Sequence, residues 1–156
     1  MSPVAVRRAG VADAPELLRL MRALAEFERY ADRFAVTEAA LIERGLDATL
    51  ASPQFIAFVA PAAGGGLAGM AVIVERAFTF DLRPSLLLKE LYVDPAARAA
   101  GIGSALMAAV LAHARARSAS NLVWDVLPDN EAAKAFYRRW GGAPVQAWER
   151  WALRPA

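Results

Sequence analysis

The chain has 156 residues, of which 57% are apolar and 22% charged, a composition typical of a globular domain and not of a disordered segment. It has no cysteine and a single histidine, which excludes disulfides, thiolate metal sites, a cysteine nucleophile and a histidine metal cluster. The formal net charge is only +2, and the basic residues form no dense stripe of the kind that nucleic-acid binding needs.

Two further features concern membranes and location. No apolar run approaches the roughly 20 residues that span a bilayer. The start of the chain, Met-Ser-Pro-Val-Ala-Val-Arg-Arg, lacks the apolar stretch of a secretory signal. We therefore expect a cytoplasmic protein with no metal, no membrane partner and no nucleic-acid partner.

The first half of the chain predicts strands and two helices. Asp13 and Pro15 mark the start of the first helix, in which apolar residues recur at helical spacing. Thr37 is expected to cap a second, short helix that ends near Gly45. Strands are expected where compact apolar runs lie between turn residues. The expected strands are 4–7, 55–60, 67–80 and 86–93, and the expected helices are 12–29 and 37–46.

The second half predicts helices that alternate with strands. The expected helices are 104–116 and 130–140, and the expected strands are 122–127 and 147–153. The glycine pair 141–142 is a C-terminal stop for the last helix. No repeat, linker or composition shift interrupts the chain, so we expect one mixed α/β domain over residues 1–156.

The segment from Leu91 to Ser104 joins an expected strand to an expected apolar helix. Unpaired backbone N–H groups and the positive end of the helix dipole make such a junction an anion site. Gly101 and Gly103 remove the Cβ atoms that would hold a phosphate away, and Arg98 adds a positive charge. The segment lacks the Lys-Ser/Thr ending of a nucleotide P-loop and is shorter than a dinucleotide fingerprint. Two glycines at this spacing also fit an ordinary turn into a helix.

The residues around this segment carry a resemblance. Leu91-Tyr-Val-Asp-Pro, then Arg98-x-x-Gly-x-Gly and a long helix, resembles the acetyl-CoA-binding motif of the GNAT N-acetyltransferase superfamily. The string from Trp124 to Gly141, in which Asn130 opens a helix that carries Tyr137, resembles the next motif of that superfamily. The resemblance implies an α/β fold with a mixed, mostly antiparallel central sheet of about six to seven strands flanked by helices.

Three shorter stretches are similar to the spermidine/spermine (diamine) acetyltransferase branch. They are Ala25-Glu-Phe-Glu, Thr37-Glu-x-x-Leu and Phe78-Thr-Phe-Asp. In that branch an acidic pair occupies the point of the fourth strand where this chain has Lys89-Glu90. The lysine disfavours a long polycationic substrate and is compatible with a substrate that carries its own carboxylate.

The resemblance implies acetyl-CoA as co-substrate. The backbone of residues 99–104, beside Arg98, would hold the pyrophosphate. Main-chain groups of residues 91–93 would meet the pantetheine arm and the acyl carbonyl, and Asn130 would bond the pantetheine arm. The implied cofactor-binding residues are Leu91, Tyr92, Val93, Arg98, Ala99, Ala100, Gly101, Ile102, Gly103, Ser104 and Asn130.

Acyl transfer to an amine also needs an acid and a base. Tyr137 is the candidate acid, since a phenol with a pKa near 10 can protonate a leaving thiolate, whose thiol has a pKa of about 8.5. It follows Asn130 by seven residues, two helical turns on the same face. Glu90 is the candidate base for the incoming ammonium, directly or through water. The alternatives are a packed aromatic for Tyr137 and a solvated carboxylate for Glu90.

Further residues are expected around the amine and at the chain's end. The expected substrate-binding residues are Phe27, Glu28, Asp81 and Asp125. His113, late in the third long helix, is expected to be structural, as a cation near a helix C-terminus. Trp148 and Trp151 lie in the expected last strand, which in relatives pairs with another subunit, so a homodimer is expected.

Together these features predict an enzyme that moves an acetyl group from acetyl-CoA to a primary amine of a small molecule. The amine would be a polyamine, a diamine or an amino-acid-like amine, attacking directly in a ternary complex. Two alternatives remain. One is a non-catalytic acyl-CoA-binding sensor module, and the other is an acetyltransferase of protein amines.

Overall fold

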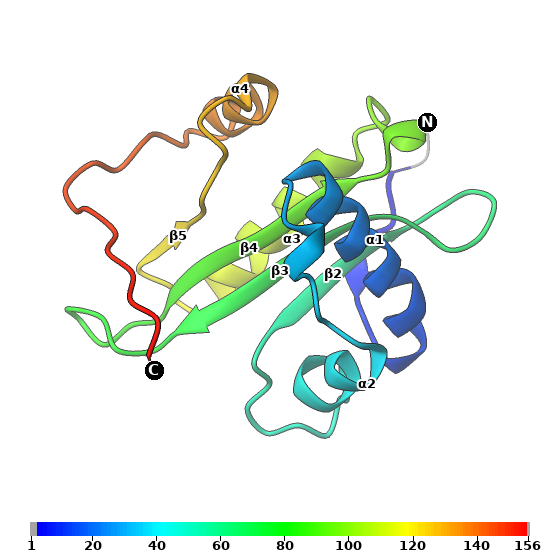
Figure 1. Cartoon of the computed structure of the whole chain (residues 1–156), viewed down its shortest axis with the longest axis horizontal. Helices are drawn as coiled ribbons and strands as arrows, with labels where there is room; N and C mark the ends of the chain where they lie inside the picture. Colours follow the sequence, from blue (N-terminus) through cyan, green and yellow to red (C-terminus); the bar gives the residue numbers. More distant parts are fainter. Residues whose placement is uncertain (1–2, 156) are drawn as a thin grey trace. The chain divides into compact units, whose positions relative to one another are not determined.

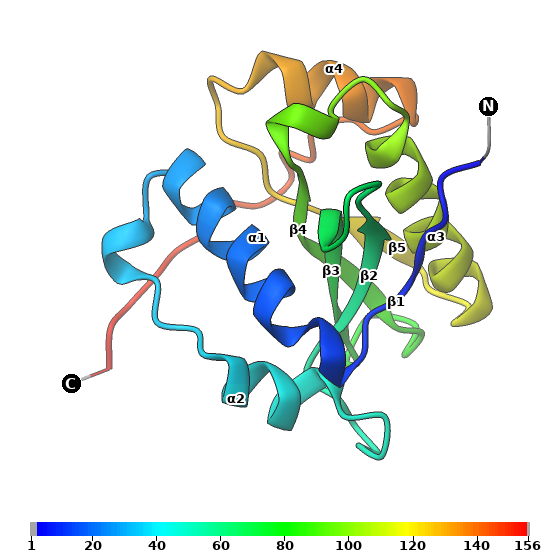
Figure 2. The same cartoon turned by 90° about the vertical axis from the view of Figure 1, so that its right-hand side faces the viewer.

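The computed structural model describes residues 3–155, and the chain divides into two compact units, residues 1–124 and 125–156. The helices and strands of the first unit are β1 (Arg7–Arg8), α1 (Ala14–Phe27), α2 (Glu38–Leu41), β2 (Ile56–Pro61), β3 (Leu67–Arg76), β4 (Ser85–Val93), α3 (Ile102–Ala116) and β5 (Asn121–Val123). Its short turns are η1 (Val11–Asp13), η2 (Ala31–Arg33), η3 (Ile42–Leu46) and η4 (Pro95–Ala97). The second unit contains α4 (Glu131–Arg139). Figure 1 labels the helices and the strands β2 to β5, and Figure 2 also labels β1.

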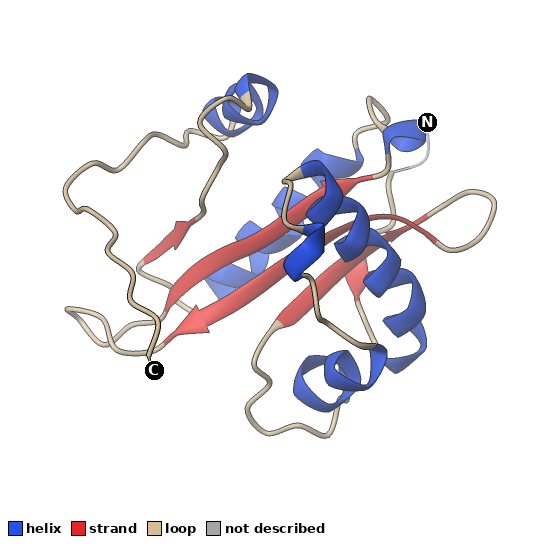
Figure 3. Ribbon diagram, viewed as in Figure 1, coloured by secondary structure: helices blue, strands red, loops and turns tan. Residues whose placement is uncertain are grey.

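The first unit is built on a mixed sheet, drawn in red in Figure 3, with strand order β1-β2-β3-β4-β5. Successive strands from β1 to β4 pair antiparallel, and β4 pairs with β5 in parallel. The predicted mixed, mostly antiparallel sheet flanked by helices is confirmed. Within residues 3–155 the sheet has five strands, so the expectation of about six to seven was too high.

Helices α1 and α3 cover opposite faces of the sheet (Figure 2). The apolar positions of α1 recur at helical spacing, and Leu17, Leu20 and Leu24 are buried in a core with residues of β2, β3 and β4. On the other face, α3 approaches β3 closely at Gly69. A Cβ at this glycine would lie 3.0 Å from Ile102 Cγ2 and 3.2 Å from Leu106 Cδ1. The glycine therefore allows the N-terminal part of α3 to pack directly on the sheet.

A β-bulge in β4 puts Glu90 and Leu88 on opposite faces of the sheet. Val72 pairs with Glu90, whereas the next residue of β3, Ile73, pairs with Leu88, so Lys89 is the extra residue of β4. Successive residues of β3 point to opposite faces. Glu90 therefore lies on the face of Val72, which is part of the core under α1, while Leu88 lies on the opposite face.

The strand predicted over 67–80 ends earlier, at Arg76. Beyond it the chain turns on its own polar contacts, because Asp81 accepts hydrogen bonds from Thr79 Oγ1 and from the backbone and side chain of Arg83. Leu82 has a φ of 58°, which reverses the chain. Phe78 and Phe80 are consequently 94% and 95% exposed instead of alternating across a strand.

The strand predicted over 147–153 is also wrong, since these residues have no regular secondary structure. Trp148 and Trp151 are 89% and 86% exposed. An alternating pattern forms a strand only where a neighbouring strand accepts its backbone hydrogen bonds, and no strand within residues 3–155 pairs with this stretch. The predicted strands 4–7 and 122–127 are shorter in the structure, at Arg7–Arg8 and Asn121–Val123.

The second unit centres on α4. The Asn130 side chain caps this helix by accepting a hydrogen bond of 3.1 Å from the Ala133 N–H. The helix ends at Gly141, which has a φ of +85°, and the Gly142 N–H closes the turn on the Tyr137 carbonyl at 3.0 Å. The predicted helix and both of its boundary signals are confirmed.

No helix in the described part of the chain has the length and apolarity needed to cross a membrane. Nor do the His, Asp and Glu residues within 3–155 form a group that could hold a metal ion.

Candidate active site

The junction of β4 and α3 forms an open helix N-terminus. Ala99 and Gly101 have φ values of +64° and +79°, which turn the chain from η4 into α3. The first backbone bond of the helix runs from the Ala105 N–H to the Gly101 carbonyl at 3.0 Å. The N–H groups of residues 102–104 precede this bond and have no acceptor within the helix. No described side chain caps Gly101, so these donors and the helix dipole face an anion-binding position.

The glycines of this loop differ in what they contribute. Gly101 needs its left-handed conformation, which costs other residues about 1–2 kcal/mol. Gly103 lies inside the first turn of α3. The positive φ is thus a conformational reason for glycine at 101, and the close approach of a phosphate to either glycine stays a prediction.

Arg98 is held beside this loop by two contacts. Its Nε donates a hydrogen bond of 3.1 Å to the Val93 carbonyl, and its guanidinium lies 5.8 Å from the centre of the Tyr92 ring. The bond to Val93 uses Nε alone, which leaves the two Nη groups of the fork for an anion. The side chain thus adds positive charge next to the open helix end.

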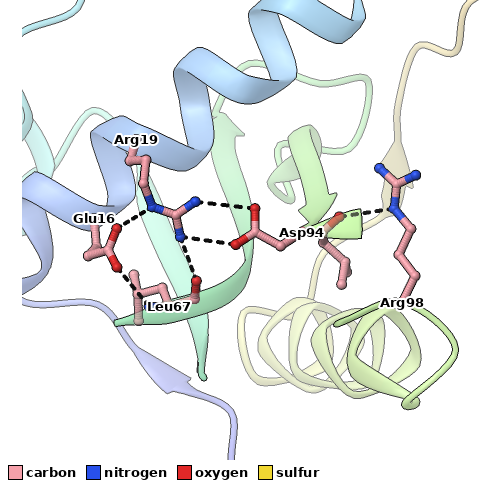
Figure 4. Close-up of polar contacts among 6 residues, drawn as sticks. Glu16, Arg19, Leu67, Asp94 and Arg98 are labelled. Atoms are coloured by element: carbon pink, nitrogen blue, oxygen red, sulfur yellow. Dashed lines mark hydrogen bonds and ion pairs between the residues drawn. The ribbon is translucent and has the colours of Figure 1, made fainter. Parts of the chain in front are cut away.

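Arg19 of α1 ties the start of the same loop to the rest of the unit (Figure 4). Its Nη1 and Nη2 donate to the two carboxylate oxygens of Asp94 at 3.2 and 3.1 Å, and Nη2 also donates to the Leu67 carbonyl at 2.8 Å. Its Nε donates to Glu16. The hydrogen bonds that Arg19 donates to Asp94, and then those that it donates to Glu16, raise its pKa above the usual range. A guanidinium that bridges α1, β3 and the residue after β4 fixes the direction in which the loop leaves the sheet.

A second polar group lies on the α1 face of β4 and consists of Glu90, Tyr30 and Glu28. The Tyr30 phenol donates a long hydrogen bond of 3.5 Å to Glu90 Oε1. Glu90 Oε2 is buried, and no described residue is hydrogen-bonded to it. Burial raises the pKa of Glu90, Lys89 opposes this rise, and the nearby charge of Glu28 adds to it. A carboxyl group with a raised pKa is a stronger base than a free carboxylate and is suited to take up a proton.

The pKa values of Glu28 and Tyr30, the other members of this group, are also raised. Burial raises the pKa of Glu28, opposed by Lys89. Burial, then Glu90 and Glu28, raises the pKa of Tyr30 to about 12, so the phenol remains protonated over the whole physiological range. Phe27, the last residue of α1, is half exposed next to Glu28. The structure thus brings together two of the residues predicted for amine chemistry, Glu28 and Glu90, and Phe27 precedes Glu28 in the chain.

Comparison with known proteins decides the family. The model of the Acetyltransferase (GNAT) family matches residues 17–142, a range that contains the loop, Glu90 and α4. The chain belongs to the GNAT acetyltransferase family. The predicted superfamily is confirmed, and the protein is an acyltransferase enzyme of a family that uses acetyl-CoA as co-substrate.

Curated relatives match this GNAT chain over nearly its whole length. A thialysine N-epsilon-acetyltransferase of Bos taurus is 31% identical over 97% of this chain and 91% of that protein, and one of Sus scrofa is 28% identical with the same coverage. These relatives confirm the predicted likeness to the diamine acetyltransferase branch.

Solved structures share the fold. An aminoglycoside acetyltransferase from an uncultured soil metagenomic sample, in complex with sisomicin, is 17% identical, with 97% of both chains covered and a TM-score of 0.77. A ribosomal-protein-alanine N-acetyltransferase from Brucella melitensis biovar Abortus 2308 is 20% identical, with 97% of this chain and 99% of that chain covered and a TM-score of 0.71. At these identities the likeness shows the GNAT fold alone.

Two of the predicted substrate residues already have ionic partners. Asp81 is paired with Arg83 at 2.7 Å in the loop between β3 and β4. Arg76 and Ser85 pair at the point where that loop begins and ends. Arg76 is four residues further along β3 than Val72, the partner of Glu90, so the loop begins about 13 Å from Glu90 along the strand. In the second unit, Asp125 is paired with Arg150 at 2.8 Å. A role for either aspartate in substrate binding stays a prediction.

Tyr137 and Asn130 both belong to α4 or its cap. Tyr137 is half-buried and its ring makes an edge contact with Phe136, with 5.5 Å between centroids. The capping bond of Asn130 uses its side-chain oxygen, so the side-chain NH2 is a donor that the cap does not need. The roles of both residues stay predictions.

The structural role of His113 has a different physical reason from the predicted one. Burial, followed by the charges of Arg8 and Arg117, lowers its pKa, which favours the neutral ring. The ring packs edge-on against Phe58, with centroids 5.9 Å apart. Its structural role therefore comes from packing, and the argument from a cation at the helix end was wrong.

Sequence reasoning missed Arg19 and Tyr30. Arg19 is exposed on α1, and its link to Asp94 spans 75 positions in the sequence. Its spacing from Glu16 would have predicted only a local ion pair. Tyr30 follows the helix in a segment that breaks the apolar period, and its contact with Glu90 spans 60 positions in the sequence.

Proposed function

We propose that this protein transfers the acetyl group of acetyl-CoA to a primary amine of a small molecule, by direct attack of the amine in a ternary complex. The observation that carries this proposal is the position of Glu90 on β4. Its buried carboxyl lies three residues before Val93, about 10 Å along the strand from the point where the anion-binding loop begins. One strand thus connects a candidate base to a candidate phosphate site.

The residues at the end of β4 fit acetyl-CoA. The uncapped N–H groups of Ile102, Gly103 and Ser104, with the backbone of 99–101, offer donors to a pyrophosphate, and Arg98 adds charge. Main-chain groups of Leu91, Tyr92 and Val93 would bond the pantetheine arm and polarise the acyl carbonyl, and the free side-chain NH2 of Asn130 would bond the same arm. Bound acetyl-CoA supplies a thioester as the acyl donor.

The chain's own residues then move two protons. Glu90 takes a proton from the substrate ammonium, directly or through water, and frees the nitrogen lone pair for attack on the thioester carbon. As the C–N bond forms and the C–S bond breaks, Tyr137 gives its phenolic proton to the departing sulfur. The raised pKa of Glu90 supports its part in this proposal. The part of Tyr137 rests on the motif that runs from Asn130 along α4.

The protein would recognise its substrate by charge. Glu28 is the anion that we propose for the substrate's ammonium, with Phe27 as an apolar wall. Asp81 and Asp125 are weaker candidates, because Arg83 and Arg150 already neutralise them. Lys89, exposed at the bulge, lies near enough to lower the pKa of both Glu28 and Glu90. A cation here supports an amino-acid-like amine with its own carboxylate over a polycation, in line with the thialysine named for the curated relatives.

Release of free thiol from acetyl-CoA tests the proposal with a panel of lysine-like amino acids, diamines, polyamines and peptides. We expect amine-dependent release with the lysine-like members and weaker release with polyamines. Turnover with peptides alone would favour the acetyltransferase of protein amines instead. No turnover with any amine, together with tight binding of acetyl-CoA, would favour the sensor module.

A single variant tests the substrate contact. Glu28→Ala should raise the KM of the amine by about tenfold, the effect of losing one charge-assisted hydrogen bond. The KM of acetyl-CoA should change little. If neither constant changes, Glu28 is not part of the site.

We also propose that residues 1–156 act as one acyltransferase domain, because the family match crosses the boundary at residue 124. A cytoplasmic homodimer is part of the proposal. Four large apolar side chains of the C-terminal segment, Val145, Trp148, Trp151 and Leu153, are exposed, and a second copy would remove them from water. Light scattering on the full chain tests this point, and a monomer at micromolar concentration would contradict it.

A further inference from the structure

The way in which α1 ends fixes Tyr30. Arg29 has a left-handed φ of 65°, and the Tyr30 N–H donates to the Ala25 carbonyl at 2.9 Å, the six-to-one bond of a Schellman motif. The Tyr30 carbonyl then accepts a bond of 3.0 Å from the Arg33 N–H of η2. The backbone on both sides of Tyr30 is thus hydrogen-bonded, and the direction of its side chain follows from the helix end.

Two structural devices make the phenol and the carboxyl meet. Regular alternation from Tyr92 puts Glu90 on the α1 face of β4, and the Schellman turn brings Tyr30 to the same face. The Tyr30 hydroxyl lies 3.5 Å from Glu90 Oε1. The other oxygen, Oε2, is buried, and no described group is bonded to it. The two oxygens of Glu90 therefore differ: Oε1 accepts a hydrogen bond from Tyr30, and Oε2 accepts none from a described residue.

We propose that Tyr30 is a positioning residue for acetyl transfer, whose phenol holds Glu90 Oε1 and so keeps the Glu90 carboxyl in one orientation while it takes the proton of the substrate amine. This inference rests on the proposed role of Glu90 as the base. A donor on one oxygen fixes the plane of the carboxyl and limits its rotation, which keeps Oε2 at one position. The residue contacts the base and not the substrate.

The charged and titratable groups that face Glu90 come from two elements. They are Lys89 from β4, and Glu28 and Tyr30 from the end of α1. Burial and Glu28 raise the pKa of Glu90, whereas Lys89 and the hydrogen bond from Tyr30 lower it. Loss of the phenol leaves burial and Glu28 in place, so the pKa of Glu90 rises further. Tyr30 itself, with a pKa of about 12, does not ionise in the range that matters.

The experiment is the pH profile of kcat/KM for the amine, measured on the full chain and on Tyr30→Phe at saturating acetyl-CoA. Phenylalanine keeps the ring and removes only the donor. We expect the acid-side limb to move upward by about half to one pH unit, the size of one ordinary hydrogen bond, because the bond from Tyr30 is long. The KM of acetyl-CoA should not change. An acid limb at the same pH in both proteins would overturn the inference.

A second readout does not depend on turnover. Carbon-13 NMR of protein labelled at glutamate carboxyls gives the pKa of Glu90 directly, with Glu90→Gln identifying its signal. The Glu90 signal should titrate at higher pH in Tyr30→Phe, and an unchanged titration would contradict the inference even if the variant were inactive.

Glu90→Gln separates this inference from the proposed function. If Glu90→Gln alone retains full activity, Glu90 is not the base and the proposed mechanism fails. If Glu90→Gln is impaired but Tyr30→Phe leaves the acid limb and the NMR titration unmoved, only the role of Tyr30 fails. In the Glu90→Gln background, Tyr30→Phe should have no further effect on kcat/KM.

Discussion

Arg19 of α1 donates two hydrogen bonds, of 3.2 and 3.1 Å, to the two carboxylate oxygens of Asp94, the residue that follows β4. Its third contact, 2.8 Å to the Leu67 carbonyl, reaches the first residue of β3. One guanidinium therefore joins α1, β3 and the start of the loop that leads to α3. Bidentate pairing of this kind fixes orientation as well as charge.

Arg19→Ala should weaken the binding of acetyl-CoA, because the loop loses the bonds that set its direction. We expect its KM to rise about three- to tenfold while kcat at saturation changes less, as measured by steady-state kinetics. Arg19→Lys should recover only part of the loss, since an ammonium cannot reproduce the fork. Arg22→Ala, at another exposed arginine of α1, is the matched control and should leave the KM unchanged. An unaltered KM in Arg19→Ala would remove the network from cofactor binding.

Gly69→Ala should destabilise the protein. The new Cβ would lie 3.0 Å from both Ile102 Cγ2 and the Tyr92 carbonyl oxygen, and the backbone oxygen cannot move without disturbing β4. Overpacking of this size costs about 1–3 kcal/mol of unfolding free energy. Urea unfolding measures the loss. Gly64→Ala is the control, since its Cβ would meet nothing within 4 Å, and an equal loss in both variants would contradict the close approach of α3.

Lys89→Glu should change the choice of substrate. The variant replaces a cation that lowers the pKa of Glu28 and Glu90 by a third carboxylate. We expect kcat/KM to fall for a lysine-like amino acid and to rise for a polyamine, so that their ratio shifts by about tenfold or more. Arg44→Glu makes the same change in net charge at an exposed position of η3 and should not alter the ratio. A constant ratio in Lys89→Glu would mean that this lysine does not contact the substrate.

Glu90→Gln should make the folded protein more stable at pH 8 while it lowers activity. The pKa of Glu90 is raised in the folded state, so folding favours the protonated carboxyl. The wild type therefore has its full Glu90 contribution below the unfolded pKa of about 4.3, and loses stability as the pH rises from there through the folded pKa. Glutamine does not ionise, so the variant does not lose this stability as the pH rises. Thermal melting of both proteins from pH 4 to pH 8 checks the sign, and a wild type that gains stability over the variant with rising pH would contradict it.

The parts of the site that were predictable are local in sequence. The strand, the glycine loop and the apolar helix of residues 86–116 follow one another, and each carries its own signal of period or turn. The cap of α4 by Asn130 and its stop at Gly141 were equally local. These signals were enough to predict the order of the elements up to α4, and the resemblance of two motifs to known acetyltransferases predicted the family.

The parts that could not be predicted depend on contacts between distant residues. The Arg19–Asp94 and Tyr30–Glu90 contacts span 75 and 60 positions, and both depend on how α1 lies across the sheet. No glycine or proline near Lys89 indicates the bulge in the sequence. The apolar alternation of 147–153 predicted a strand, but a strand also needs a partner, which a sequence pattern does not supply.

The most direct test of the account is the rate of thiol release from acetyl-CoA, with a lysine-like amine, in wild type and in Tyr137→Phe. We expect amine-dependent release by the wild type, and a kcat lower by about a hundredfold or more in the variant, because a general acid contributes that much. The KM of acetyl-CoA should be similar in both. Equal kcat values would contradict the role of Tyr137, and the absence of amine-dependent release from the wild type would contradict acetyl transfer to a small amine.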